Sequence, residues 1–460
     1  MRKRSAFVFL FFAALSGCAS YHAMPLDTRP TLLHEVPHLI INAGQMPLPE
    51  LSSRPFNPDD GLDMTEVSIL AVVNNPGLKV ARDERKIASA QLIAAGILPN
   101  PQLTAALDHP IAVAPGYVNA FNLGLSYDIA ALITRNASAE AARAHSLKVD
   151  LNVLWQEWQV VQQARLLFVR SMEQEKMMRL LQSYRELFDT RYRRAGEALQ
   201  EGNLTIGAAS ADLTALQDAQ ARINDLERGI SKTRHDLNLL VGLSPEVRLR
   251  LVGDISLPEP DQTKIKTYLA QLPQRRPDLL ALQAGYASQE QRFRKAVLAQ
   301  FPAFNFGLTR ARDTSDINTI GFDITLSLPV FDRNQGNIAI EKATRKRLYD
   351  EYQSRLNEAY SMVDRLQAQM KLSDRQYNEV TRILPELELT VTRAEAALEA
   401  GNMNITTYTD LQAALLKKRI EAITLEQTTL EQRAALQTLL GSELHMDIAP
   451  AEIQFDEKGN

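Results

Sequence analysis

Residues 321–334 read GFDITLSLPVFDRN and alternate between apolar and polar side chains. Phe322, Ile324 and Leu326 lie on one side of this alternation, whereas Asp323 lies on the other. A period of two residues is typical of a β-strand with one apolar and one polar face. Most of the surrounding sequence has the period of an amphipathic helix instead. The stretch therefore raises a question: what contacts the apolar face of such an isolated strand, while water contacts its polar face?

The composition indicates a large, mainly helical protein that does not bind nucleic acid. The chain has 460 residues and a formal net charge of −4, from 51 basic and 55 acidic side chains. This balance lacks the basic excess that nucleic acid attracts. Beyond the N-terminal leader, no run of apolar residues is long enough for a membrane-spanning helix, so we expect any membrane crossing to be made by strands.

The N-terminus has the layout of an export signal followed by a lipid attachment site. Three basic residues precede the apolar run 6–15, which is too short to span a bilayer. The run leads into the letters LSGC, which resemble the bacterial lipobox and end at Cys18, the only cysteine. We predict that residues 1–17 are a signal peptide and that Cys18 carries a covalent lipid such as palmitate. In this motif Ala19, rather than Asp, implies the outer membrane.

The chain is an internal duplication. The segment LQEGNLTIGAASADLTALQDAQ from Leu199 matches LEAGNMNITTYTDLQAALLKKR from Leu398, at a spacing of 199 residues. The segment NPGLKVARDERKIASAQ from Asn75 matches RPDLLALQAGYASQEQR from Arg276, at a spacing of 201 residues. Two matches at nearly the same spacing argue against chance similarity between helices of simple composition.

Both halves are expected to follow one plan of helix, β-hairpin and long helical hairpin. Gly-Asn pairs at 202–203 and 401–402 are typical of a helix C-cap and place the two hairpin tips. In chain order we predict a helix at 64–98, strands at 102–108 and 120–129, a long helix at 137–199 and a return helix, and then a helix at 263–298, strands at 303–310 and 319–328, a long helix at 338–398 and a second return helix.

The Pro-rich and polar segments mark the domain boundaries. We divide the chain into a signal peptide at 1–17, a lipidated N-terminal arm at 18–62, a first repeat at 63–243, a linker at 244–262, a second repeat at 263–442 and a C-terminal tail at 443–460, with β-hairpins spanning 102–129 and 303–328. The arm, the linker and the tail are expected to wrap around the helices.

Strands of about ten residues with one apolar and one polar face match a membrane β-barrel with lipid outside and water inside. A small sheet that packs on helices is the competing interpretation. Four strands cannot close a barrel in lipid, because open edges leave backbone groups unpaired there. Two copies of the chain would supply eight strands and three copies twelve, and a conduit of useful width favours three.

These features together resemble outer-membrane efflux proteins of the TolC type, in their lipoprotein branch. The resemblance covers roughly residues 60–442 and rests on NPGLKVARDERKIASAQ with PNPQL, on LSLPVFDRNQGNI and on the two Gly-bearing tips. It implies a mainly α fold with a small β part, and a homotrimer whose 12-stranded barrel continues into a periplasmic α-helical barrel. It also implies a passive, gated conduit that binds a periplasmic adaptor and the inner-membrane pump of a tripartite RND-like system, with no enzymatic activity and no cofactor apart from the lipid.

The resemblance also points to site residues. The tips are the expected adaptor-docking sites, formed by Gly202, Asn203, Leu204, Gly401, Asn402 and Met403. Carboxylates close to the tips, Asp410 and less strongly Asp212, are candidates for the periplasmic gate, although Asp410 departs from the spacing seen in relatives. The simpler alternatives are that the tips are merely capped turns and that the acids complement a helix dipole.

Two other classes of protein are weighed against the channel. A periplasmic adaptor-like scaffold also contains a coiled-coil hairpin, but usually one hairpin rather than two. An enzyme is suggested only by HEVPH at 34–38, which matches a zinc-protease pattern. Pro37 removes an amide from the helical turn that this pattern needs, so we expect neither catalysis nor a metal site there. The exported cargo stays open between drugs, solvents and heavy-metal ions, with a slight preference for the metals.

Overall fold

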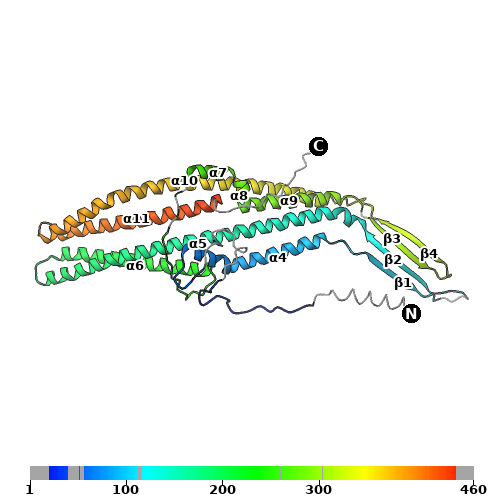
Figure 1. The fold of residues 1–460 in the computed structure, drawn as a ribbon, viewed down its shortest axis with the longest axis horizontal. Helices are drawn as coiled ribbons and strands as arrows, with labels where there is room; N and C mark the ends of the chain where they lie inside the picture. Colours follow the sequence, from blue (N-terminus) through cyan, green and yellow to red (C-terminus); the bar gives the residue numbers. More distant parts are fainter. Residues whose placement is uncertain are drawn as a thin grey trace.

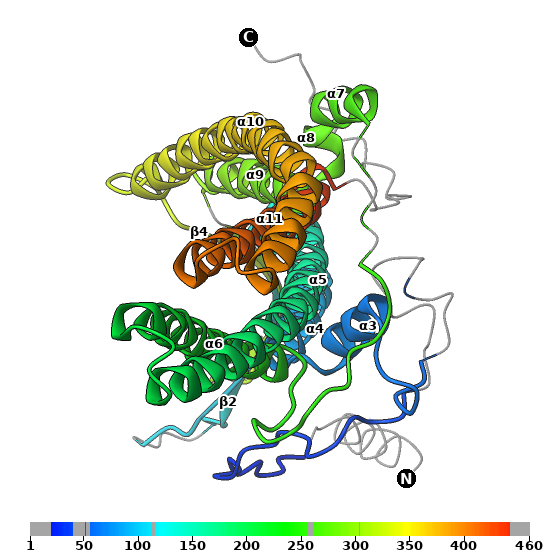
Figure 2. The same cartoon turned by 90° about the vertical axis from the view of Figure 1, so that its left-hand side faces the viewer.

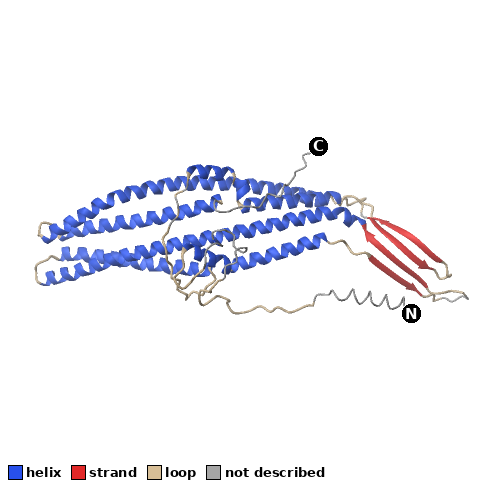
Figure 3. Cartoon of the chain, in the orientation of Figure 1, coloured by secondary structure: helices blue, strands red, loops and turns tan. Residues whose placement is uncertain are grey.

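The computed structural model describes residues 20–39, 51, 56–111, 116–255, 257, 259, 261–302 and 304–441. Two helical hairpins lie at one end of the elongated molecule and a four-stranded sheet lies at the other (Figure 1). Figure 3 shows that helices make up most of these residues and that the strands are confined to one end, which confirms a mainly α fold with a small β part. Within the described residues, no helix has both the length and the apolar character needed to cross a membrane.

The order of elements in the second half repeats that of the first. The first half contains α3 (Met64–Asn74), α4 (Pro76–Gly96), β1 (Gln102–Asp108), β2 (Ala120–Asp128), α5 (Ile129–Gln200) and α6 (Ile206–Leu240). The second half contains α7 (Gln262–Ala270), α8 (Leu272–Arg275), α9 (Pro277–Leu298), β3 (Phe304–Arg312), β4 (Asn318–Leu326), α10 (Gln335–Glu399) and α11 (Ile405–Leu440).

The prediction of one continuous helix before each β-hairpin is wrong. The predicted helix 64–98 is broken at Asn75, which has ψ 123° and separates α3 from α4. The predicted helix 263–298 is broken twice, and its second break lies at Arg276 with ψ 121°. Proline disfavours the helical conformation of the residue before it, and both breaks directly precede a proline. The motif that marks the duplication therefore also marks the start of a new helix.

The long helices begin earlier than predicted. α5 starts at Ile129 instead of residue 137, because the side chain of Asp128 accepts a hydrogen bond from the backbone N–H of Ala131 at 3.1 Å and caps the helix. α10 starts at Gln335 instead of residue 338, after Asn334 with φ +62°. β2 and α5 adjoin without a loop, so at this one of the four connections the chain passes directly from the sheet into the helical part.

The four strands form one antiparallel sheet in the order β1-β2-β3-β4. The two halves of the chain meet in its middle, where Leu125 of β2 lies opposite Leu308 of β3. Leu103 on β1 and Phe322 on β4 continue the same apolar row. β1 and β4 each have one edge without a partner strand among the described residues.

Helices from the two parts of each repeat are stacked end to end. The side chains of Asn74 and Asn75 donate to the carbonyls of Val241 and Leu240 at 2.6 and 2.8 Å, so the end of α6 rests on the start of α4. In the second repeat Arg275 donates to the carbonyl of Gly441 at 3.3 Å. These bonds satisfy carbonyls that a helix C-terminus leaves free. α5 thus lies between the stack of α4 and α6 and the stack of α9 and α11 (Figure 2).

A hydrophobic core lies at mid-length, where α3 covers α5. Leu70 of α3 and Phe168 of α5 are fully buried there, together with Leu237 of α6. The N-terminal arm crosses this region, because the N–H of Leu33 donates to Gly242 O at 3.2 Å and the N–H of Ser244 donates back to Leu33 O at 2.8 Å. The core therefore fixes the ends of the helical hairpins that lie away from their tips. The tips themselves form the free end of the molecule.

Candidate functional site at the hairpin tips

The two hairpin tips share one backbone conformation. Gly202 follows α5 with φ +75°, and the N–H of Asn203 donates to a carbonyl in the last turn of the helix at 2.8 Å. Gly401 follows α10 with φ +74°, and the N–H of Asn402 makes the equivalent bond at 2.8 Å. A left-handed residue that closes a helix in this way is usually glycine, because a side chain would be strained. The predicted C-caps are confirmed.

The six predicted docking residues differ in exposure. Gly202, Asn203, Gly401 and Asn402 are exposed, whereas Leu204 and Met403 are half-buried. Met403 packs against the apolar cluster of the second hairpin. Each tip therefore presents an exposed polar turn next to one partly covered apolar side chain. Docking of an adaptor at these residues stays a prediction.

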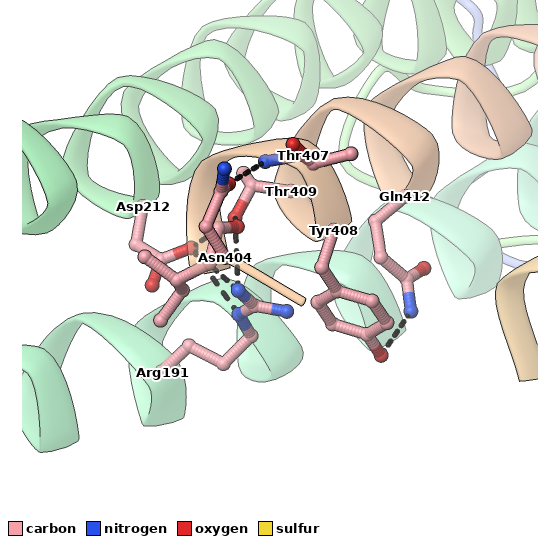
Figure 4. A network of polar contacts seen from close by, with 8 residues as sticks. Arg191, Asp212, Asn404, Thr407, Tyr408, Thr409 and Gln412 are labelled. Atoms are coloured by element: carbon pink, nitrogen blue, oxygen red, sulfur yellow. Dashed lines mark hydrogen bonds and ion pairs between the residues drawn. The ribbon is translucent and has the colours of Figure 1, made fainter. Parts of the chain in front are cut away.

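A buried polar group near the tips joins the two hairpins, and we call Arg191, Asp212 and Thr409 the tip cluster (Figure 4). Arg191 of α5 donates from Nε to Asp212 Oδ1 of α6 at 3.2 Å and from Nη2 to Thr409 Oγ1 of α11 at 2.8 Å. The Thr409 hydroxyl donates to the same Asp212 oxygen at 2.8 Å. One carboxylate oxygen thus connects three helices.

Aromatic packing and a second hydrogen bond hold the arginine in place. The guanidinium carbon of Arg191 lies 4.4 Å from the centre of the Tyr408 ring. The side-chain amide of Gln412 donates to the Tyr408 hydroxyl at 2.7 Å, and Tyr408 is 2% exposed. A cation over an aromatic face is attracted to it, and more strongly when water is excluded. Tyr408 and Thr409 therefore fix α11 to Arg191 from two sides.

The burial of Asp212 changes what its carboxylate can do. Its side chain is 0% exposed, and Oδ2 has no hydrogen-bond partner among the described residues. Such a carboxylate is tolerable only as long as its cation stays in place. Within one chain, the Asp212 carboxylate is therefore paired with Arg191 and does not face water. Its part in a periplasmic gate stays a prediction.

Asp410 lies next to the tip cluster but is oriented differently. It is exposed, and it makes no hydrogen bond or ion pair with the residues that the structure describes. It follows Thr409 directly on α11, so it lies on the same helix as one member of the tip cluster. Its role as an acidic residue at the opening stays a prediction.

A second charged group joins α5 to α11 farther from the tips. Lys176 of α5 donates a hydrogen bond to Glu426 of α11 and lies 3.8 Å from Glu173 Oε2. The Glu173 side chain is 5% exposed, and burial raises the pKa of its carboxyl, although Lys176 opposes this effect. Together with Tyr377 of α10, these residues line a cavity of about 700 Å³.

A third link lies between the other two. Arg419 of α11 donates to Glu388 of α10 at 2.7 Å, and its guanidinium carbon lies 6.0 Å from the centre of the Tyr184 ring of α5. The hairpins are thus in polar contact at three levels, through the Lys176–Glu426 ion pair, through Thr409 in the tip cluster and through the contact of Arg419 with Tyr184. The tip cluster is the most deeply buried of the three and the nearest to the free end.

The other predicted sites lie elsewhere in the chain. Cys18 and the signal peptide at 1–17 lie outside the described residues, so lipidation stays a prediction. Residues 34–38, the HEVPH stretch, are not helical, and His38 lies 4.0 Å from Asp59. No group of three or more His, Cys, Asp or Glu side chains within the described part of the chain is placed to hold a metal ion.

Sequence reasoning missed Arg191, Thr409 and Tyr408. Arg191 looks like one more charge on a long amphipathic helix, and its partners lie 21 and 218 residues away in the chain. The duplication contains a signal that could have found them. Counted from the tips, the position of Asp212 is occupied by Leu411 in the second repeat and that of Arg191 by Thr390. A charged pair that is apolar or neutral in the other copy is a candidate for a specific role.

A family model and a characterised relative match parts of this sequence. Residues 268–442 match the model of the family described as outer membrane efflux protein. The cobalt-zinc-cadmium resistance protein CzcC of Cupriavidus metallidurans is 30% identical over 148 residues. This match covers 31% of the chain and 34% of CzcC, so it spans about a third of the length of that relative.

Solved structures share the fold over most of the chain. CusC, described in work on transmembrane channel formation, superposes with a TM-score of 0.68 and 19% identity over 88% of this chain and 99% of CusC. The MtrE outer membrane channel of Neisseria gonorrhoeae, in an open state, superposes with a TM-score of 0.67 and 15% identity over 93% of this chain and 98% of MtrE. At such identities the likeness concerns the fold alone.

Proposed function

Because the chain belongs to the outer membrane efflux protein family, we propose that it is the outer-membrane channel of a tripartite efflux pump. The family consists of channels and not of enzymes. The observation that carries the proposal is a single sheet with two open edges and two chemically different faces, at the opposite end of the molecule from two helical hairpins. Substrate passes from pump and adaptor through the channel to the outside, and the channel itself is passive.

The open edges of the sheet support assembly into a homotrimer. In lipid, backbone groups without a hydrogen-bond partner are costly, so β1 of one copy has to pair with β4 of the next. Three copies then close a 12-stranded barrel, and their helices continue it as a periplasmic tube. In the trimer, the helices of neighbouring copies also cover apolar side chains that one chain leaves exposed, among them Ile87 on α4 and Ile383 on α10.

The chain is divided, in this proposal, as the duplication suggests. Repeats at 63–243 and 263–442 are joined by the linker 244–262 and supply one β-hairpin and one helical hairpin each. Cleavage after residue 17 leaves Cys18 as the lipid-bearing N-terminus, which anchors the arm 18–62 to the inner leaflet of the outer membrane. The lipid is the one non-protein group that we assign.

The tips are the surfaces that we assign to the adaptor. Three copies present six tips, and the equal backbone conformation of Gly202 and Gly401 makes all six similar in shape. A ring of six similar loops suits a hexameric adaptor, which connects the channel to the inner-membrane pump.

The tip cluster is the part that we assign to the gate. Arg191 and Asp212 hold α11 to the first hairpin through Thr409, so the second hairpin cannot swing away while these bonds persist. Opening replaces them with contacts to the adaptor or to water. MtrE, whose solved structure is an open state, supports the idea that this fold has both open and closed forms. Asp410 would then line the opening.

Divalent heavy-metal ions are the cargo that we favour. CzcC is named for resistance to cobalt, zinc and cadmium, and the matched stretch is the support for this choice. A strain that lacks this chain and its pump is expected to lose tolerance to these metals while tolerance to organic solvents and drugs stays unchanged. Loss of drug tolerance alone would overturn the choice of cargo and leave the channel proposal intact.

Conductance and oligomeric state test the proposal itself. The full chain, extracted from outer membranes in detergent, is expected to be a trimer that conducts ions in planar bilayers. Conductance should increase when the tip cluster is broken by Asp212→Asn, and a variant with Cys18→Ser should still conduct once inserted. A chain that stays monomeric without detergent, with Phe322 and Ile324 shielded inside it, would overturn the proposal.

A further inference from the structure

Two arginines interrupt the apolar face of the sheet near its far end. Arg310 of β3 lies opposite Leu123 of β2 and Ile320 of β4. Two residues farther along, Arg312 lies opposite Phe121 and Asn318. Because side chains of directly opposed residues share a face, both arginines belong to the face that also carries Leu308.

The rows of this face that lie nearer the helices are apolar. From the helical end outward, its cross-strand rows contain Phe304 and Leu326, then Tyr127, Phe306 and Ile324, and then Leu103, Leu125, Leu308 and Phe322. The opposite face of the same strands carries small and polar residues, including Thr104, Gly124, Thr309 and Gly321. An arginine on the small, polar face would need no explanation, whereas two on the apolar face do.

The two arginines differ in their bonds. Arg312 donates to the carbonyl of Asn119 at 2.9 Å, lies 3.4 Å from Asp316 and stacks on Phe121 at 5.6 Å. These contacts give it a structural role at the end of the strand. Arg310 is exposed and has no hydrogen bond or ion pair with the described residues. Its five N–H donors are therefore available to a partner outside the chain.

The position of Arg310 suits a charged partner at the boundary of a membrane. It lies two residues before the end of β3, and the exposed side chains of Leu123 and Ile320 flank it with apolar surface. Two residues of strand correspond to about 7 Å, so the Arg310 row lies that far beyond the last fully apolar row, toward the outside. A charged residue on a lipid-facing surface is disfavoured at mid-depth and tolerated near the interface, where it can reach polar headgroups.

We propose that Arg310, supported by Arg312, binds phosphate groups of the anionic lipid in the outer leaflet of the outer membrane. The inference rests on the proposed function, in which the apolar face of the sheet meets lipid. A guanidinium group donates two parallel hydrogen bonds to a phosphate and is well suited to this partner. Asp316 offsets part of the charge of Arg312, so Arg310 contributes most of the binding. A trimer has three such positions.

Native mass spectrometry of the full-length trimer tests this assignment. The protein is exchanged into phosphatidylcholine nanodiscs that contain lipid A with two phosphates, with one phosphate or with none, and the retained lipid A is counted. We expect retention to fall at least tenfold from the form with two phosphates to the form without phosphate. Arg310→Gln should abolish this preference, and Arg310→Lys should retain part of it.

Arg382→Gln serves as the matched control, because it removes an exposed arginine from α10 that lies nearer the tip end of this helix than its sheet end. It should retain lipid A as the unmodified chain does. Equal retention of all three forms, or an Arg310→Gln variant with unchanged preference, would show that Arg310 merely extends into water and would overturn the inference. A conducting trimer with that result leaves the channel proposal intact, whereas a chain that never inserts or trimerises overturns both.

Discussion

The two long helices, α5 and α10, have the same plan and opposite surroundings. α5 packs against α4, α6, α9 and α11, and it buries large side chains such as Trp158 and Phe188. α10 packs mainly against α9 and α11. The contrast is clear at one pair of equivalent positions, which lie at the same distance from the two tips. There α5 buries the carboxylate of Glu173, whereas α10 leaves Leu372 44% exposed.

This difference shows what duplication conserved and what it changed. The backbone of the tips, the strands and the stacked helices is repeated, because the same elements pack against one another in each repeat. The surfaces diverged, because α5 is an interior helix of one chain whereas α10 lies at its edge. An edge helix with apolar side chains exposed over its length is the kind of surface that takes part in protein contacts, and our proposal places it against a neighbouring copy of the chain. The three polar contacts described above, in contrast, connect one hairpin to the other through Glu426, Thr409 and Tyr184.

Charges placed on the exposed face of α10 are expected to have the largest effect. Leu372 and Ile383 are 44% and 43% exposed and lie about three helical turns apart on one side of the helix. Leu372→Asp combined with Ile383→Asp should leave the helical content of the chain unchanged and abolish the trimer, because charge in an apolar interface cannot be hydrated. Sedimentation in detergent and circular dichroism check the two halves of this prediction. Gln369→Asp, at an exposed polar position of the same helix, should remain trimeric.

The next effect concerns the tip cluster, which only the first hairpin supplies with charge. Asp212→Leu introduces the residue that the second repeat has at this position and leaves Arg191 buried without its carboxylate, so we expect a loss of about 3 kcal/mol in the free energy of unfolding. Adding Arg191→Thr removes the unpaired cation and should recover most of that loss. Denaturant unfolding measures both values.

The same pair of variants separates stability from gating. The double variant should conduct more than the unmodified channel in planar bilayers, because the bonds from the first hairpin to Thr409 are gone. If stability recovered and conductance stayed low, the tip cluster would be a packing feature and not a lock. This outcome would also mean that the asymmetry between the hairpins has no part in opening.

A smaller effect is expected at the tips, where the hairpins are alike. Gly202→Ala and Gly401→Ala should each lower stability by about 1 kcal/mol, because both glycines have positive φ and a methyl group there meets no other atom. Gly207→Ala is the matched control, since its Cβ also meets nothing and its helical conformation suits alanine, so it should be neutral or stabilising. Thermal unfolding measures all three. Unequal losses at the two tips would reveal a contact that only one of them makes.

The sequence predicted features that depend on neighbouring residues and missed those that depend on distant ones. Alternation in 321–328 is enough for a strand with two faces, and a Gly-Asn pair after a long amphipathic run is enough for a capped tip. The breaks before Pro76 and Pro277 were predictable too, from the restriction that proline places on its predecessor. The tip cluster was not, since Thr409 and Asp212 are 197 residues apart and meet only because α11 packs against the first hairpin.

The smallest expected effect concerns Glu173, the interior carboxylate that α5 has where α10 has Leu372. Burial raises the pKa of this carboxyl above its ordinary 4.5, so the folded chain binds the proton more tightly than the unfolded chain. Its contribution to stability is thus complete below pH 4.5 and is lost as the pH rises toward the raised value. Glu173→Gln should remove this decline and flatten the pH dependence of the melting temperature above pH 4.5, with a gain of less than about 1 kcal/mol at neutral pH. Glu175→Gln, at an exposed neighbour on the same helix, should leave the profile unchanged, and a profile equally steep in both variants would assign the decline to other groups.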